Sequence, residues 1–99
     1  MSKNRLLYSQ YLQIYEVEQS FLDSLSDSGL IQVVLQDDGE KFIEYDDLSE
    51  IEQFMRWHYD LNINVEGIEA LYHMLGRVKK LQSEIERLGS ELRFYKSLR

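Results

Sequence analysis

Apolar side chains recur at helical spacing near the start of this chain. One set steps by i, i+3, i+4 and i+7, and it consists of Tyr8, Tyr11, Leu12 and Tyr15. A second set continues the same period and consists of Val17, Phe21, Leu22 and Leu25. The run Asp27-Ser28-Gly29 ends this pattern, because Gly29 can adopt the left-handed conformation that terminates helices. The pattern predicts two short amphipathic helices, and we assign the three tyrosines of the first to the core.

The hydrophobic pattern changes from a helical period to a strand-like one between Leu30 and Tyr45. Residues 31–36 are mostly β-branched and apolar, and residues 41–45 form a second strand-like run. The residues between them, Asp37-Asp38-Gly39-Glu40, have the composition of a tight turn. We expect a two-stranded β-hairpin, or wing, at this point.

Two further helices are predicted after the hairpin. Asp46 and Asp47 lie where an N-cap belongs, and we expect the helix that follows to end near Asp60. Its apolar stripe consists of Leu48, Ile51, Phe54, Met55 and His58. Asn64 is the next natural cap, and apolar residues then recur by threes and fours over residues 65–95. If continuous, this last helix has about 31 residues and a length of roughly 45 Å.

The C-terminal helical pattern is too long for the rest of the chain to cover. We therefore predict a folded domain in residues 1–64 and a C-terminal helix in residues 65–99 that packs on the domain and self-associates. Charged residues flank the apolar seam of this helix, as in a coiled coil. The seam consists of Leu75, Val78, Leu81, Ile85, Leu88, Leu92 and Tyr95. The alternative is a seam that folds back on its own domain, but a patch of this length favours a homodimer.

Acidic residues dominate the N-terminal part of the chain. The 99 residues include 11 basic and 18 acidic side chains, for a formal charge of −7. No Lys or Arg occurs from Leu6 through Glu40. A surface that binds a phosphate backbone needs cations, because much of its affinity comes from the release of condensed counterions. The charge argues against nucleic acid and favours a basic protein partner.

Catalysis and metal binding have little support in the sequence. The absence of cysteine rules out disulfides and thiolate metal sites. His58 and His73 lie on separate predicted helices, and no nucleophile motif accompanies them. The acidic turn at residues 37–40 lacks the ligand spacing of a calcium loop. We expect no enzymatic activity, no metal and no cofactor.

The sequence has no apolar run that would direct the chain to a membrane. Its N-terminus alternates apolar and polar residues and lacks the continuous apolar region of a signal peptide. No later run approaches transmembrane length. We expect a cytoplasmic protein that makes no contact with membranes.

The order of helix, helix, hairpin, helix and long C-terminal helix resembles the MerR-type winged helix-turn-helix family. The segment Tyr45-Asp46-Asp47-Leu48-Ser49-Glu50-Ile51 and the later segment Val65-Glu66-Gly67-Ile68-Glu69-Ala70-Leu71 are similar to its second half. More narrowly, Gly67-Ile68 followed by a Leu-rich run to Leu92 resembles the chaperone-modulator branch, the CbpM-like proteins, as does Ser28-Gly29-Leu30-Ile31. The resemblance implies a mainly α fold with a small β-hairpin wing and a long C-terminal coiled-coil helix.

This resemblance implies a binding partner and not a reaction. CbpM-like proteins bind the J-domain of a DnaJ-type co-chaperone and inhibit its stimulation of Hsp70, and such J-domains carry a basic helix. An acidic surface is suited to that helix by charge. The residues that we expect to contact the partner are Glu16, Glu18, Asp23 and Asp27, with Asp37 and Asp38 as second choice.

Three other interpretations stay open. A MerR-like transcriptional regulator would bind DNA through its second helix and wing, but these offer only Lys41, besides Lys3 and Arg5 near the N-terminus. The acidic residues could also form an ordinary solvated face, although such faces usually mix both charges. A dimerisation adaptor that uses only its C-terminal helix is the third.

Overall fold

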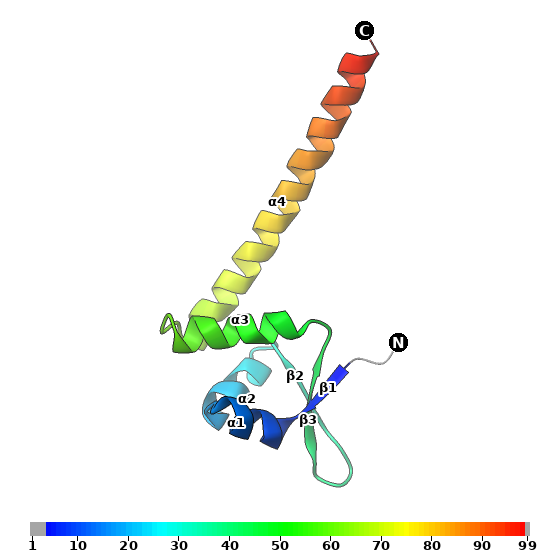
Figure 1. Cartoon of the computed structure of the whole chain (residues 1–99). Coiled ribbons are helices and arrows are strands. Elements are labelled where there is room, and N and C mark those ends of the chain that lie inside the picture. Colours follow the sequence, from blue (N-terminus) through cyan, green and yellow to red (C-terminus); the bar gives the residue numbers. More distant parts are fainter. Residues whose placement is uncertain (1–3, 99) are drawn as a thin grey trace. The chain divides into compact units, whose positions relative to one another are not determined.

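The described residues, 4–98, form four helices and three strands in this computed structural model (Figure 1). In chain order the elements are β1 (Asn4–Leu7), α1 (Tyr8–Tyr15), α2 (Gln19–Asp27), β2 (Gln32–Leu35), β3 (Lys41–Tyr45), α3 (Leu48–Tyr59) and α4 (Val65–Ser97). Contacts divide the chain into one unit through Glu69 and another from Ala70 onward. Lys3, one of the two basic residues noted near the N-terminus, lies outside the described residues. The fold is mainly helical, as predicted.

The first two helices follow the apolar pattern. Gly29 has φ +82° just after α2, which is the left-handed conformation expected there. Tyr8 and Tyr11 are buried in the core. Our assignment of Tyr15 to the core is wrong: its ring lies 4.7 Å from that of Tyr11, but its side chain is 57% exposed. The physical reason is position, because Tyr15 is the last residue of α1 and lies at the edge of the core.

The predicted β-hairpin is present but belongs to a three-stranded antiparallel sheet with the order β1-β3-β2. The expectation of only two strands is therefore wrong. In the pairing of β1 with β3, Leu6 lies opposite Ile43 and Arg5 opposite Glu44. The Arg5 guanidinium and the Glu44 carboxylate form an ion pair of 3.0 Å across these strands. Because β1 has only four residues and its partner lies far along the chain, local hydrophobic period gives little indication of it.

Side-chain caps begin both later helices. A carboxylate oxygen of Asp47 accepts the backbone N–H of Ser49 at 3.0 Å, which satisfies one of the free donors at the start of α3. The Asn64 side-chain oxygen accepts the N–H of Gly67 at 2.8 Å at the start of α4. The sequence predicted the Asn64 cap and offered Asp46 and Asp47 for the other, of which Asp47 is the cap. With 33 residues, α4 is about 50 Å long.

All helices of the first unit and strand β3 contribute to one hydrophobic core. Its buried apolar residues are Tyr8, Tyr11, Val17, Phe21, Leu22, Leu25, Ile31, Ile43, Ile51, Phe54 and Ile68. Ile68 is fully buried, so the start of α4 is part of this core. The core holds α2, the end of α3 and the first residues of α4 in place, and a groove lies among these segments.

Candidate functional site

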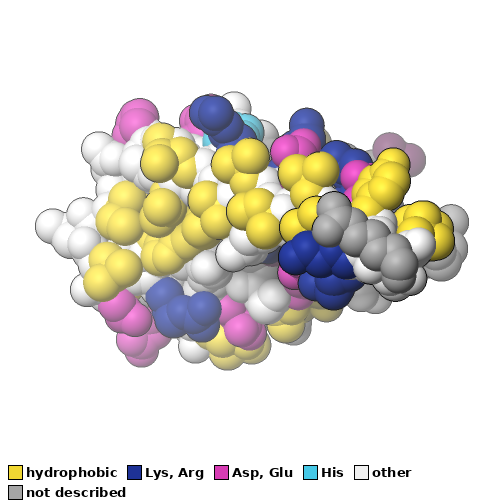
Figure 2. Space-filling view, turned by 90° about the horizontal axis from the view of Figure 1, so that it is seen from above, with side chains coloured by type: hydrophobic (Ala, Val, Ile, Leu, Met, Phe, Trp, Pro, Cys, Tyr) yellow, Lys and Arg dark blue, Asp and Glu magenta, His cyan; other side chains and the backbone are white. Residues whose placement is uncertain are grey.

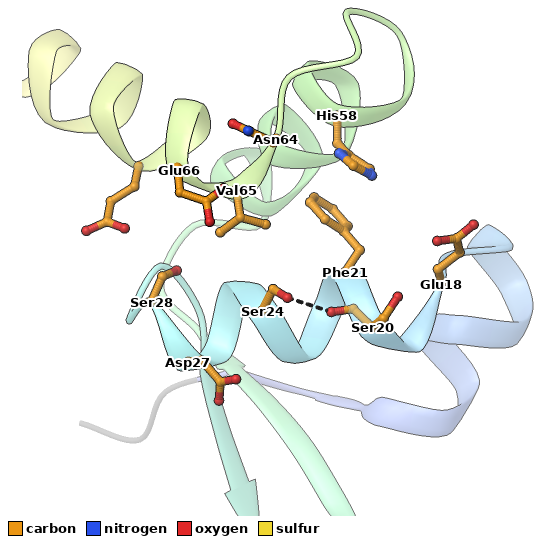
Figure 3. A pocket seen from close by; sticks show the side chains of 11 residues that line it. Glu18, Ser20, Phe21, Ser24, Asp27, Ser28, His58, Asn64, Val65 and Glu66 are labelled. Carbon is orange, nitrogen blue, oxygen red and sulfur yellow. Dashed lines mark hydrogen bonds between the residues drawn. The ribbon is translucent and has the colours of Figure 1, made fainter.

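A groove of about 580 Å³ lies among α2, the C-terminal end of α3 and the first turns of α4 (Figure 3). Its lining residues are Glu18, Ser20, Phe21, Ser24, Asp27, Ser28, His58, Asn64, Val65, Glu66 and Glu69. Four of them carry carboxylates, and no Lys or Arg occurs among the described residues that line it. We call this feature the acidic groove. All of its residues belong to the first unit.

Phe21 and His58 form an aromatic pair inside the acidic groove. Their rings are stacked, with centroids 3.8 Å apart and planes within 9°. His58 Nδ1 lies 2.9 Å from the carbonyl oxygen of Ile63, a hydrogen bond that fixes the orientation of the imidazole ring. Figure 3 shows Phe21 pointing from α2 toward His58, whereas Asp27 points away on another side of α2. The groove therefore combines an aromatic wall with peripheral carboxylates.

The charge of the surrounding domain has the same sign as the groove. Residues 4–69 contain fifteen acidic side chains and only three basic ones, Arg5, Lys41 and Arg56. Arg5 pairs with Glu44, and the Lys41 ammonium lies 5.3 Å from the centre of the Tyr8 ring. Two of the three cations are thus engaged within the β1–β3 region. The negative potential around the groove has little local compensation.

The structure distributes the six predicted partner-binding carboxylates over several places. Glu18 and Asp27 line the acidic groove, whereas Glu16 follows α1 and is not among the residues that line it. Asp37 and Asp38 are exposed in the turn between β2 and β3. Asp23 is half-buried, and its carboxylate accepts a hydrogen bond from the Tyr8 hydroxyl. Asp23 therefore already has a structural role inside the domain.

The sequence interpretation missed two carboxylates of the acidic groove. Glu66 and Glu69 lie three residues apart at the start of α4, which brings them to one side of that helix. The sequence shows both glutamates near the start of the predicted helix. Acidic residues are common there because they interact favourably with the helix dipole, so their position alone does not indicate a binding site. Only the packing of Ile68 into the core places these two residues beside α2.

The predicted seam residues of α4 are exposed in the isolated chain. Their exposed fractions run from 36% at Leu75 to 68% at Ile85 and Tyr95. Met74 is also exposed. From Met74 through Val78 to Tyr95, apolar residues recur at alternating spacings of four and three without a break, so Leu75 lies at the flank of the seam. Figure 2 shows hydrophobic side chains gathered into a band with charged side chains along its margins. The sequence interpretation overlooked Met74, although its spacing was visible.

Residues 4–98 contain neither a metal-ligand cluster nor a membrane-spanning helix. No group of three or more His, Asp or Glu side chains in this range is arranged to hold a metal ion. Within the same range, no helix has the length and apolar character needed to cross a membrane.

Comparison with known families assigns this architecture. The family described as MerR HTH family regulatory protein matches residues 6–90. The chain belongs to this MerR helix-turn-helix family. No curated protein and no solved structure matched the chain. The MerR match begins in β1 and extends far into α4, so the acidic groove and most of the exposed seam lie inside the family region.

Proposed function

We propose that this chain is a cytoplasmic, non-catalytic member of the MerR family that binds the J-domain of a DnaJ-type co-chaperone and inhibits its stimulation of Hsp70. The observation that carries the proposal is the acidic groove, which is lined by the carboxylates Glu18, Asp27, Glu66 and Glu69 and by the stacked Phe21–His58 pair. A basic J-domain helix has the charge and the shape that this groove would accommodate.

Electrostatics would act on both the rate and the specificity of such binding. A surface with fifteen carboxylates in residues 4–69 attracts a cationic helix over distances of about 10 Å at moderate salt. It repels acidic competitors, which gives selectivity before any close contact forms. The half-buried His58 ring then adds contact to the partner's methylene chains.

DNA binding, the alternative function, has less support from the same surfaces. In a DNA-binding protein of this type, α2 and the β2–β3 turn would face phosphates and would need cations. Here α2 contains Asp23 and Asp27 without any Lys or Arg, and the turn contains Asp37, Asp38 and Glu40. The charge of these two surfaces favours a cationic polypeptide over a nucleic acid as the partner.

The proposal includes a homodimer formed through α4. The exposed seam of Met74, Val78, Leu81 and the residues after them would leave a long apolar stripe in water in a single chain. A second copy supplies a matching stripe, with Lys79, Lys80, Glu84 and other charged residues at the margins.

Neutralising the acidic groove tests the proposed partner. The triple variant Glu18→Gln, Asp27→Asn, Glu66→Gln keeps side-chain size and leaves the Asp23–Tyr8 bond intact. Three exposed ion pairs at about 0.5 kcal/mol each predict about a tenfold loss of affinity for a J-domain, and a shallower salt dependence. Isothermal titration at two salt concentrations measures both effects.

The matched control neutralises the turn between β2 and β3. The variant Asp37→Asn, Asp38→Asn, Glu40→Gln removes the same number of charges, and the amide introduced by Asp38→Asn would retain an oxygen that can accept the Glu40 N–H. It should bind the J-domain almost as well as the unaltered chain. Equal losses in the two triple variants would reject the groove as the specific site. Tight, strongly salt-dependent binding to duplex DNA would instead support the regulator.

A further inference from the structure

A second groove, of about 400 Å³, lies between the end of α1 and the face of α3 in the first unit. Its apolar lining consists of Tyr11, Tyr15, Val17, Met55 and Tyr59. Tyr15 is 57% exposed and Tyr59 45% exposed, so two aromatic rings remain in contact with water at its edge. We call it the aromatic groove. Clustered exposed aromatic and methionine side chains are typical of surfaces that receive an apolar anchor.

The rim of the aromatic groove is mainly negative. Glu16, Glu52 and Asp60 contribute three carboxylates, and Arg56 contributes the one guanidinium among its described lining residues. Glu16 and Glu52 are both exposed and available to a ligand. The combination of apolar lining and negative rim fits a segment that carries a large apolar side chain next to Lys or Arg.

Glu16 occupies a backbone position that favours glycine. It follows α1 with φ +53° and ψ +41°, and its N–H donates to the carbonyl of Leu12. A residue with a Cβ atom is strained in this left-handed conformation, and such strain often accompanies a functional side chain. The carboxylate at the groove's rim thus occurs at a place where the fold alone would prefer no side chain.

Lining residues of the two grooves contact one another. The Tyr59 hydroxyl of the aromatic groove accepts the backbone N–H of Glu18, a residue of the acidic groove, at 2.9 Å. Phe21 meets Tyr59 edge-on at 5.6 Å while its face stacks on His58. These contacts fix the positions of the two grooves relative to each other within the first unit.

We propose that the aromatic groove receives a large apolar side chain of the same cationic segment that binds the acidic groove. The partner is then a basic helix with one aromatic or long aliphatic anchor beside its Lys and Arg residues. This inference rests on the proposed function for the sign of the partner's charge. The acidic groove would supply attraction, and the aromatic groove would select among basic helices by their anchor.

Two synthetic peptides provide the probe. Both are helical and Lys-rich, and they differ only in a single Phe that is replaced by Ser in the second. Each is titrated into the full ¹⁵N-labelled chain. The Phe peptide is expected to bind at least tenfold more tightly and to shift the amide signals of Tyr15, Glu16 and Tyr59. Equal affinities of the two peptides would overturn the inference.

Variants separate this inference from the proposed function. Tyr15→Ala should remove the preference for the Phe peptide and leave Ser-peptide binding unchanged, whereas Ile14→Ala, 70% exposed on α1 but outside the groove, should change neither. Equal effects of these two variants would overturn the aromatic groove. The double variant Glu18→Gln, Asp27→Asn tests the acidic groove separately. If it binds the Phe peptide with unchanged affinity and salt dependence, and still prefers it over the Ser peptide, the acidic groove is rejected as the binding site for the cationic residues. The aromatic groove is then retained as the site for the Phe side chain.

Two more variants address strain and self-occupancy. Glu16→Gly should raise the unfolding temperature, because glycine relaxes the left-handed position, and yet weaken binding of the Phe peptide. A variant that is more stable and binds equally well would overturn the role of Glu16.

Phe94 of this chain is exposed and lies near Arg93 and Lys96 in the sequence, so it has the same combination of aromatic ring and cations as the Phe peptide. Tighter Phe-peptide binding by Phe94→Ser would show that a second copy already occupies the groove, which would overturn a separate partner.

Discussion

Tyr8 and Tyr11 are the buried phenols of α1, and their protonation is coupled to folding. Burial raises the pKa of Tyr8 well above its ordinary value, and the hydrogen bond to the Asp23 carboxylate raises it further. Burial also raises the pKa of Tyr11 to about 12, with a smaller contribution from the nearby Tyr15. Both hydroxyls therefore keep their protons in the folded domain at a pH where an unfolded chain begins to ionise.

Alkaline pH is expected to destabilise the domain. The unfolded tyrosines lose protons near a pKa of about 10, while Tyr11 keeps its proton in the folded state up to about pH 12. This contribution to stability is complete below about pH 10 and is lost as the pH rises from there through the folded pKa. Urea unfolding followed by Trp57 fluorescence at about pH 8, 10 and 11 measures the loss. Tyr11→Phe should reduce this loss of stability at high pH. A urea midpoint of the unaltered chain that does not change with pH would contradict the coupling of tyrosine protonation to folding.

At the scale of elements, the turn before α4 shows how local chemistry and packing combine. Asn64 caps α4 through the N–H of Gly67, and the N–H of Ile63 donates to the carbonyl of Trp57 at the end of α3. A Cβ atom on Gly67 would lie 2.7 Å from Ile63 Cγ2 and 3.1 Å from the Asn64 cap oxygen. This tight turn fixes where α4 begins, and the packing of Ile68 then places Glu66 and Glu69 in the acidic groove.

Two glycines of α4 should respond to alanine with opposite signs. Gly76→Ala meets no atom within 4 Å and should stabilise by about 1 kcal/mol, the usual difference in helix propensity. Gly67→Ala gains the same propensity but must displace the stiff Ile63 side chain, so we expect a net loss of about 1 kcal/mol. Urea unfolding followed by far-ultraviolet circular dichroism compares them. Stabilisation by both substitutions would show that the turn yields without cost.

At the scale of the whole molecule, charge is divided unequally along the chain. Residues 4–69 carry fifteen acidic and three basic side chains, whereas residues 70–99 carry three acidic and seven basic ones. The proposed partner surface and the proposed dimer helix thus differ in sign as well as in apolar character. A cationic partner is attracted to the first and repelled by the second.

Disrupting the seam should dissociate the proposed dimer without unfolding the first unit. Leu81→Glu with Leu88→Glu places two charges on the apolar stripe, and neither residue belongs to the buried core. Light scattering should then give a mass near 11.9 kDa, while near-ultraviolet circular dichroism of the core aromatics stays unchanged. A monomeric mass for the unaltered chain would reject the dimer.

Local sequence chemistry anticipated most of the elements. The helical spacing of the apolar residues around Tyr8, Phe21 and Ile51 predicted α1, α2 and α3. The caps at Asp47 and Asn64 marked where α3 and α4 begin. These signals are readable because helix periods and caps join residues only a few positions apart. Strand β1 was not predicted by the same local signals, because its partners at residues 42–45 lie far along the chain.

The candidate site divides in the same way. The sequence by itself determined that the first part of this protein is acidic and helical and that its long C-terminal helix has an apolar seam, since charge and period are properties of the chain. Only the tertiary structure decided that Glu66 and Glu69 join Glu18 and Asp27 around one groove, and that Asp23 turns to Tyr8. The reason is physical: burial of Phe21, Phe54 and Ile68 in a common core brings distant segments together, and no local pattern encodes which neighbours they meet.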